Sequence, residues 1–250
     1  MQPIHASLAL LALTGALTHA AHASILGSAA SFAVLAGSTV TNTGASVLTG
    51  HAGVWPGSAI TGFPPATLTG SLHAADAVAA LAQADVTLAY DSLNSMTRTA
   101  DLTGTDLGSL VLTPGVYFFA SSAQLSSSLV LDAQGNPDAL FVFQITSTLT
   151  TSSSASVTLI NASDACNVYW QVGSSATLGT NTTFQGTILA MTSITLTTGA
   201  SIVEGRALAR NGAVTLDANS IDATCIPSPG SAAAFLLLAT HAAARRRPIR

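Results

Sequence analysis

A threonine recurs about every nineteen residues in the second half of this chain, each time within a short run of alternating character. The runs are SVTLI, SATLG, SITLT and AVTLD, whose threonines Thr158, Thr177, Thr195 and Thr215 are separated by 19, 18 and 20 residues. A threonine side chain offers a methyl and a hydroxyl and is stiff at its first torsion, so little entropy is lost when it is ordered. A row of such side chains can order water through its methyls and hydroxyls. The pattern indicates an uncharged binding plane for a partner that is itself a lattice.

The elements that would position these threonines are β-strands. Alternation of apolar and polar residues is typical of a strand with one buried face, so Val214 and Leu216 should point inward and Thr215 outward. One such strand in each repeat of about twenty residues predicts a β-solenoid whose coils stack about 4.8 Å apart. A second set of strands is apolar on both faces, which predicts that something covers its outer side. These strands are Phe141–Ile145, Val168–Val172, Ile188–Met191 and Ala207–Ala209.

One long helix, from about Leu72 to Asn94, is predicted to supply that cover. Its apolar residues follow spacings of three and four, which place them on one face of a helix. They are Ala75, Val78, Ala82, Val86, Ala89, Leu93 and Met96. Asp76 in the first turn suits the helix dipole. Upstream of this helix, an opening coil is expected with Val40 facing inward and Thr39 and Thr41 facing outward.

The composition excludes several classes of function. Of 250 residues, 48% are hydrophobic and 7% are charged, against roughly 25% charged in ordinary soluble domains, and there is no lysine. Nucleic-acid binding needs a dense basic surface, which this chain lacks. Catalysis needs convergent titratable groups, yet His51 and His73 lie outside the repeats and no nucleophile or metal-ligand motif occurs. The sequence therefore predicts a protein that is not an enzyme and that uses no cofactor, metal or small-molecule substrate.

Both ends of the chain are predicted to be processing or targeting segments. Residues 1–23 are expected to be a secretory signal peptide, since an apolar run from Leu8 to Leu17 precedes the small-residue site Ala21-His22-Ala23. Residues 24–226 would then be one all-β domain. Residues 227–250 combine a Pro-Ser-Pro motif, a short apolar stretch and an arginine cluster, which resembles bacterial C-terminal sorting tails. The alternative is a plain hydrophobic tail. We expect a secreted or surface-attached protein, with the tail as its attachment to the cell envelope.

The two cysteines, Cys166 and Cys225, allow two interpretations. An even number of cysteines in an exported protein favours a disulfide, and closing this 59-residue separation would stabilise the fold by about 2–4 kcal/mol. Two unpaired thiols are the other interpretation.

Several longer segments resemble the microbial ice-binding, or antifreeze, protein family. They are FAVLAGSTVTNTG, TGFPPATLTGSLHAADA, LTPGVYFF, LVLDAQGNPDALFVFQI, NVYWQVGSSATLGT and GRALARNGAVTLDAN, and they run in order from about Ile25 to Cys225. The resemblance implies an all-β fold with one long helix. The β part would be a right-handed, discontinuous β-solenoid of roughly triangular section, with the helix packed alongside. It also implies that the first coil packs beside the last coils, out of sequence order.

The same resemblance implies a function. A monomer would adsorb to ice through one Thr/Ser/Ala-rich face, giving thermal hysteresis and inhibiting ice recrystallisation. The positions carried over to that face are Thr39, Thr41, Ser156, Thr158, Ser175, Thr177, Ser193, Thr195, Thr197, Ala213 and Thr215. The alternative is a cell-surface adhesive or matrix β-solenoid without ice activity.

Overall fold

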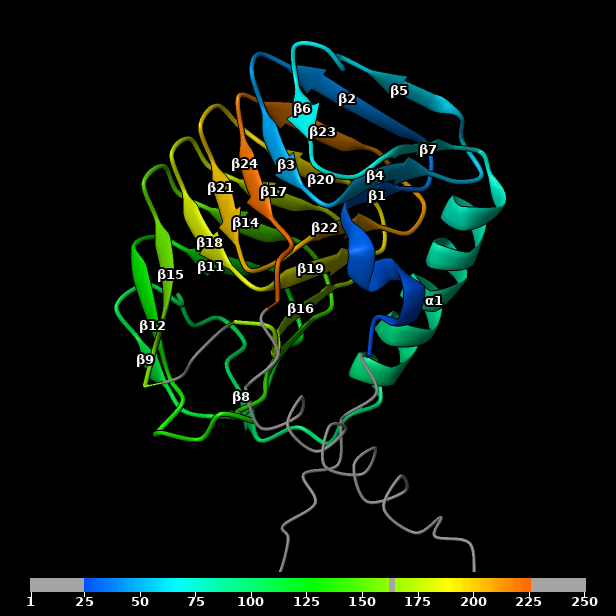
Figure 1. Ribbon diagram of the computed structural model, residues 1–250. Helices are drawn as coiled ribbons and strands as arrows, with labels where there is room; N and C mark the ends of the chain where they lie inside the picture. Colours follow the sequence, from blue (N-terminus) through cyan, green and yellow to red (C-terminus); the bar gives the residue numbers. More distant parts are fainter. Residues whose placement is uncertain (1–24, 162–164, 226–250) are drawn as a thin grey trace, which may run out of the picture. The chain divides into compact units, whose positions relative to one another are not determined.

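The alternating segments of the chain form short parallel strands that gather into three sheets, one for each side of a solenoid (Figure 1). The computed structural model describes residues 25–161 and 165–225, and these residues fall within one compact unit, Ala23–Ser228. The predicted signal peptide and the predicted C-terminal tail lie outside the described residues. Each full coil contributes one strand to each sheet, so the β-solenoid prediction is confirmed.

The three sheets are named A, B and C, and the strands of each follow in spatial order. Sheet A contains β7 (Leu72–Ala74), β4 (His51–Val54), β1 (Phe32–Ala36), β22 (Ala207–Ala209), β19 (Thr187–Ala190), β16 (Val168–Val172), β13 (Phe141–Ile145), β10 (Gly115–Phe119) and β8 (Ala100–Asp101). Sheet B contains β11 (Ala123–Leu125), β14 (Leu149–Thr151), β17 (Ala176–Leu178), β20 (Ile194–Leu196), β23 (Val214–Asp217), β2 (Thr39–Thr43) and β5 (Ala59–Thr61). Sheet C contains β6 (Thr67–Leu68), β3 (Val47–Thr49), β24 (Ser220–Asp222), β21 (Ser201–Val203), β18 (Thr183–Gln185), β15 (Ser156–Ile160), β12 (Ser128–Asp132) and β9 (Val111–Leu112).

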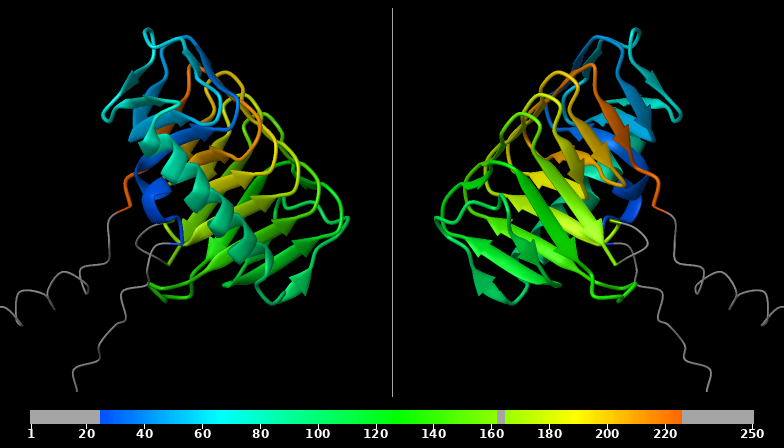
Figure 2. Two further views of the ribbon diagram at one scale, coloured as in Figure 1. Left: turned by 90° about the vertical axis from the view of Figure 1, so that its right-hand side faces the viewer. Right: turned by 90° about the vertical axis from the view of Figure 1, so that its left-hand side faces the viewer.

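The coils are not stacked in sequence order. The first strands β1, β2 and β3 pair with the last strands β22, β23 and β24, so the N-terminal coils sit at the C-terminal end of the stack. Helix α1 (Ala77–Asn94) then carries the chain along sheet A toward the opposite end, where β8 starts the main series of coils (Figure 2). The discontinuity implied by the family resemblance is therefore confirmed.

The interior changes composition along the stack. Tyr117, Phe143 and Trp170 occupy equivalent inward positions in β10, β13 and β16, and the rings of Phe143 and Trp170 stack at 3.8 Å. The next positions in the same row are Ile188 and Ala207, in shorter coils. Wide coils need aromatic rings to fill their centre and narrow coils need small residues, because protein interiors are close-packed.

Helix α1 begins later than the sequence predicts. Residues 72–74 form strand β7 instead, and Asp76 is the N-cap, with its carboxylate accepting a hydrogen bond from the Ala79 N–H at 2.8 Å. That hydrogen bond is the main cause of the lowered pKa of Asp76. Two predicted positions of the buried stripe are wrong, because Ala75 precedes the helix and Val78 is 48% exposed. No helix in the described ranges is long and apolar enough to cross a membrane.

Helix α1 covers the outer side of sheet A, as the two-sided apolar strands predict. Its buried side chains pack on an outer apolar layer of the sheet. The apolar spacing in the sequence did not predict that Gln83 and Tyr90 are among them. The buried helix residues are Ala79, Ala82, Gln83, Val86, Ala89, Tyr90 and Leu93, and the sheet residues include Leu35, Val116, Val142, Tyr169, Leu189 and Leu208. At the helix end, the Gln144 side-chain amide donates to the carbonyls of Leu93 and Met96 at 2.7 and 3.0 Å. Helix α1 therefore covers much of the outer side of sheet A.

Replacing Leu93 with alanine is expected to lower the free energy of unfolding by about 2–4 kcal/mol, because its fully buried side chain would leave a cavity between helix and sheet. Leu88 on the same helix is 68% exposed, so Leu88→Ala should cost less than about 0.5 kcal/mol. Urea denaturation of the two variants measures the difference. Equal midpoints would contradict the packing of α1 on sheet A.

Candidate functional site

The outer surface of sheet B carries an unbroken row of six threonines, which we call the threonine row. Neighbouring members are paired in register across six successive strands, so one threonine stands beside the next. In spatial order they are Thr150, Thr177, Thr195, Thr215, Thr41 and Thr61, with Gln124 at the end next to Thr150. Parallel strands are about 4.8 Å apart, which sets the repeat of methyls and hydroxyls along the row.

The strands are held in this orientation by their inward side chains. Residues that alternate with the threonine row face the solenoid interior, and Ile194, Val214 and Val40 are completely buried. A one-residue slip in register would expose that apolar set, so the pairing is strongly fixed. The threonines, in contrast, are half-buried or exposed. Burial of the core thus determines which side chains reach the surface.

A second row of small residues lies two positions before each member of the threonine row. It consists of Thr148, Ser175, Ser193, Ala213, Thr39 and Ala59. Two serines of this row lie against the backbone, because the Ser175 hydroxyl accepts from the Ser193 N–H at 3.3 Å and the Ser193 hydroxyl accepts from the Ala213 N–H at 3.2 Å. The side chains of the second row are short, and two of them are held against the backbone. They therefore leave the neighbouring threonine side chains accessible.

The hydroxyls of the threonine row make few contacts with the protein. Thr41 donates to Thr215 at 3.3 Å across the junction between β2 and β23. Within the described parts of the chain, the hydroxyls of Thr150, Thr177 and Thr195 have no protein partner. They are free to hydrogen-bond to water, while their methyls are held in a fixed repeat.

Charge is almost absent from this surface. Among the seven strands of sheet B, Asp217 is the single ionisable residue, and its carboxylate accepts a hydrogen bond from Thr198. Thr197 lies at this same edge, where its hydroxyl donates to the Leu178 carbonyl at 2.9 Å. The neighbouring residue Gly179 passes close to the backbone of Ser152, and a Cβ at Gly179 would lie 2.6 Å from that backbone. No side chain can therefore be placed at Gly179 beside Thr197. The predicted residue Thr197 thus borders the face and its hydroxyl is already engaged.

Nine of the eleven site residues from the sequence lie on or at the edge of sheet B, and two do not. Ser156 and Thr158 belong to β15 of sheet C, where Ser156 pairs with Ser128 and Thr183. Placing them in the same row as Thr177 is therefore wrong. The residue beside Thr177 is Thr150, 27 positions earlier, because that coil is lengthened by the segment between β15 and β16. The spacing of 19 from Thr158 to Thr177 matched the shorter coils by coincidence.

The residues missed by the sequence prediction are Thr148, Thr150, Ala59 and Thr61. A usable signal existed, since each coil visits sheets A, B and C in turn and the first strand after Phe141–Ile145 must lie on sheet B. That strand is Leu149–Thr151. Following this order, instead of a fixed period, identifies Thr150 as the equivalent of Thr177.

Sheet C is the other uncovered side, and its outer surface is less uniform. One row, from Ser128 through Ser156, Thr183, Ser201 and Ser220 to Val47, is mostly serine. The adjoining row mixes valine, an amide and a carboxylate, and includes Val130, Thr158, Gln185, Val203 and Asp222. A charged group keeps its own hydration shell, so sheet C is a poorer plane for ordering water than sheet B.

The structure joins Cys166 and Cys225 in a disulfide, with Cα atoms 5.6 Å apart. The bond connects the segment between β15 and β16 to the end of the described chain. It lies away from sheet B and plays no direct part in the candidate site.

Comparison with known proteins adds to this geometry. The family model described as "Ice-binding-like" matches residues 34–222, which is most of the chain. The chain belongs to this family. An ice-binding protein of Nostoc sp. (strain HG1) is 58% identical over 224 residues, covering 89% of this chain and 83% of the relative. The family match begins within β1 and ends with β24, so it spans the solenoid.

Solved structures of family members share the fold. A crystal structure of an ice-binding protein from an Antarctic biological consortium superposes with a TM-score of 0.76 at 50% identity, over 79% of this chain and 89% of that one. An ice-binding protein from the Antarctic ascomycete Antarctomyces psychrotrophicus gives a TM-score of 0.78 at 41% identity, over 80% of this chain and 98% of that one. The β-solenoid with an accompanying helix is thus the architecture of this family, which has no enzymatic function.

Proposed function

We propose that this protein binds ice through the outer surface of sheet B. The single observation that carries the proposal is the threonine row, six residues in register on a sheet whose single ionisable residue is Asp217. Relatives that cover most of the chain are named as ice-binding proteins, which supports this function over the adhesive alternative. The contact residues we assign are the threonine row together with Thr39, Ser175, Ser193 and Ala213 of the second row.

The proposed mechanism depends on fixed side chains that order water. Methyl groups at a regular repeat favour cages of water, and the free hydroxyls and the backbone anchor those waters. The ordered layer then merges with the growing ice lattice. Each contact is weak, but many contacts formed together act like multivalent binding and prevent release. Because Asp217 at its edge is the single ionisable residue of the face, electrostatic attraction contributes little to the adsorption.

The direct test uses the purified domain, residues 24–226. We expect it to shape ice crystals, to separate the melting and freezing temperatures, and to slow recrystallisation in a frozen sucrose solution. A folded domain that leaves ice growth unchanged would contradict the proposal and would favour the adhesive alternative.

We also propose that the protein acts outside the cytoplasm as a monomer. The apolar run before Ala21-His22-Ala23 supports export, and the Pro-Ser-Pro motif followed by arginines supports attachment to the cell envelope. N-terminal sequencing of the functional protein should give Ser24 as the first residue. An intact Met1 on that protein would contradict export by this signal.

A further inference from the structure

A groove runs along the seam where helix α1 meets the corner between sheets A and B. Its volume is about 270 Å³, and its walls come from one side of the helix and from two corners of the solenoid. The helix supplies Ala80, Gln83, Ala84 and Thr87, and the corners supply Trp55, Pro56, Arg210 and Asn211. The groove is separate from the threonine row, whose six residues do not line it.

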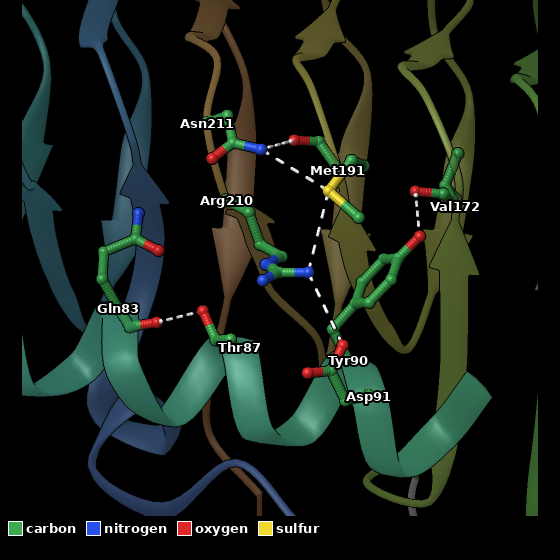
Figure 3. Close-up of polar contacts among 8 residues, drawn as sticks. All are labelled: Gln83, Thr87, Tyr90, Asp91, Val172, Met191, Arg210 and Asn211. Carbon is green, nitrogen blue, oxygen red and sulfur yellow. Dashed lines mark hydrogen bonds and ion pairs between the residues drawn. The ribbon is translucent and has the colours of Figure 1, made fainter. Parts of the chain in front are cut away.

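Arg210 is held in this groove with few hydrogen-bond partners. Its side chain is 19% exposed and points from the end of β22 toward helix α1 (Figure 3). Its Nη1 lies 3.7 Å from the Met191 sulfur and 3.7 Å from a carboxylate oxygen of Asp91, and its guanidinium carbon lies 5.1 Å from the centre of the Tyr90 ring. Within the described ranges, the guanidinium donates a hydrogen bond to the Met191 sulfur and forms an ion pair with Asp91, and it donates no hydrogen bond to an oxygen.

Arg206 in the same fold differs from Arg210, because its guanidinium has close hydrogen-bond acceptors. Arg206 donates to the carbonyls of Ala30 and Ala223 at 2.8 Å each. A guanidinium has five N–H donors in a planar fork that matches a carboxylate. Arg210 directs few of these donors to protein groups, which leaves the others to water or to an external acceptor. Asp91 forms an ion pair with Arg210 at 3.7 Å, but its side chain is 66% exposed, so solvent screens this pair and leaves the other donors of the guanidinium available.

The remaining walls of the groove suit a sugar ring. Trp55 is 38% exposed and lines the groove beside Pro56, so it offers an aromatic surface against which the C–H face of a sugar can lie. The amide of Asn211 donates to the Met191 carbonyl at 3.0 Å, and the amide of Gln83 donates to the Ala209 carbonyl at 3.0 Å. Both side chains therefore keep a carbonyl oxygen that can accept from sugar hydroxyls.

We infer that this groove binds a saccharide unit that carries a carboxylate, such as a uronic acid residue of an acidic polysaccharide. The carboxylate would pair with Arg210, the hydroxyls with the amide oxygens of Asn211 and Gln83, and the ring face with Trp55. The groove is slightly smaller than the roughly 300–1,000 Å³ of pockets for drug-sized ligands, which suits a single ring. A shallow site of this size should bind weakly, and repeated units along one polymer would strengthen attachment.

Tryptophan fluorescence provides a direct assay, because the chain has two tryptophans and they differ in environment. Trp170 is fully buried in the solenoid core, whereas Trp55 lines the groove. Titration of the folded domain with a glucuronic acid oligomer should change the emission in a saturable way. A neutral glucose oligomer of the same length should bind at least tenfold more weakly, and acetate should not saturate the signal in the same range.

Two variants make the assay decisive. Arg210→Gln is expected to weaken binding of the glucuronic acid oligomer at least tenfold. Arg98→Gln removes the same charge from a different place, where the guanidinium lies over the Phe118 ring, and should bind like the original protein. Equal affinity of Arg210→Gln, equal binding of the neutral oligomer, or no saturable change at all would overturn the inference. The assay contains no ice, so its outcome is independent of the proposed ice binding.

Discussion

Replacing Thr195 with tyrosine is expected to remove most of the thermal hysteresis while leaving the fold intact. Thr195 lies between Thr177 and Thr215 in register, near the middle of the threonine row. A tyrosine ring there would stand above the plane and hold ice away from the neighbouring threonines as well. Because the side chain points to solvent, the free energy of unfolding should change by no more than about 0.5 kcal/mol.

The matched control is the same substitution on the other uncovered face. Thr158 is an exposed threonine at a strand position of sheet C, so Thr158→Tyr adds an equal bulk to an equivalent strand environment. It should retain nearly full hysteresis in the same measurement. If Thr195→Tyr keeps its activity, or if Thr158→Tyr loses it, the assignment of the binding face to sheet B is wrong.

Replacing Arg206 with methionine is expected to lower the free energy of unfolding by about 2–4 kcal/mol. The side chain is 4% exposed, and burial lowers the pKa of its guanidinium. It joins three parts of the fold that are distant in sequence, since it lies before β22 and donates to Ala30 near the first strand and to Ala223 after the last. Methionine fills similar space but leaves both carbonyls without this donor, which is the origin of the cost.

The effect of Arg206→Met is measured by chemical denaturation with Arg98→Met as control. Arg98 is exposed and lies over the Phe118 ring, a contact worth about 0.5–1 kcal/mol at such a site. A loss of stability in Arg206→Met no greater than in Arg98→Met would show that Arg206 does not hold the segments around Ala30 and Ala223 together.

The strand pattern was predictable from sequence because burial imposes it locally. Val40, Val214 and Leu216 are completely buried, as alternation predicts, and Thr41 and Thr215 point outward. The two-sided apolar strands likewise predicted a cover over sheet A. Both inferences need nothing beyond neighbouring residues, since a strand with one exposed face must alternate and a strand with two buried faces must not.

The alignment of one coil with the next was harder to predict, because it depends on coil length. Fixed spacing placed Thr158 beside Thr177, whereas the wider coils at one end of the solenoid put Thr150 there. The extra residues of this coil lie between β15 and β16, where the chain passes from sheet C to sheet A. A period taken from the narrow coils cannot anticipate that difference.

Long-range polar contacts left no local signal at all. Nothing in the sequence around Arg206 indicates that its donors reach Ala30, 176 residues earlier. Similarly, apolar spacing placed Val78 on the buried side of α1, while the structure buries Gln83 there, with its amide bonded to the Ala209 carbonyl. Such pairings arise from the out-of-order stacking of coils, so they become visible only in three dimensions.

Adsorption of fluorescently labelled protein to a single-crystal ice hemisphere tests the central claim most directly, because it measures attachment to ice. The original protein should coat the hemisphere on defined planes. Thr177→Tyr, in the threonine row of sheet B, should leave the ice dark, whereas Val130→Tyr, on sheet C, should coat the same planes as the original protein. Coating by Thr177→Tyr together with loss of coating by Val130→Tyr would contradict the assignment and would move the ice-binding surface to sheet C.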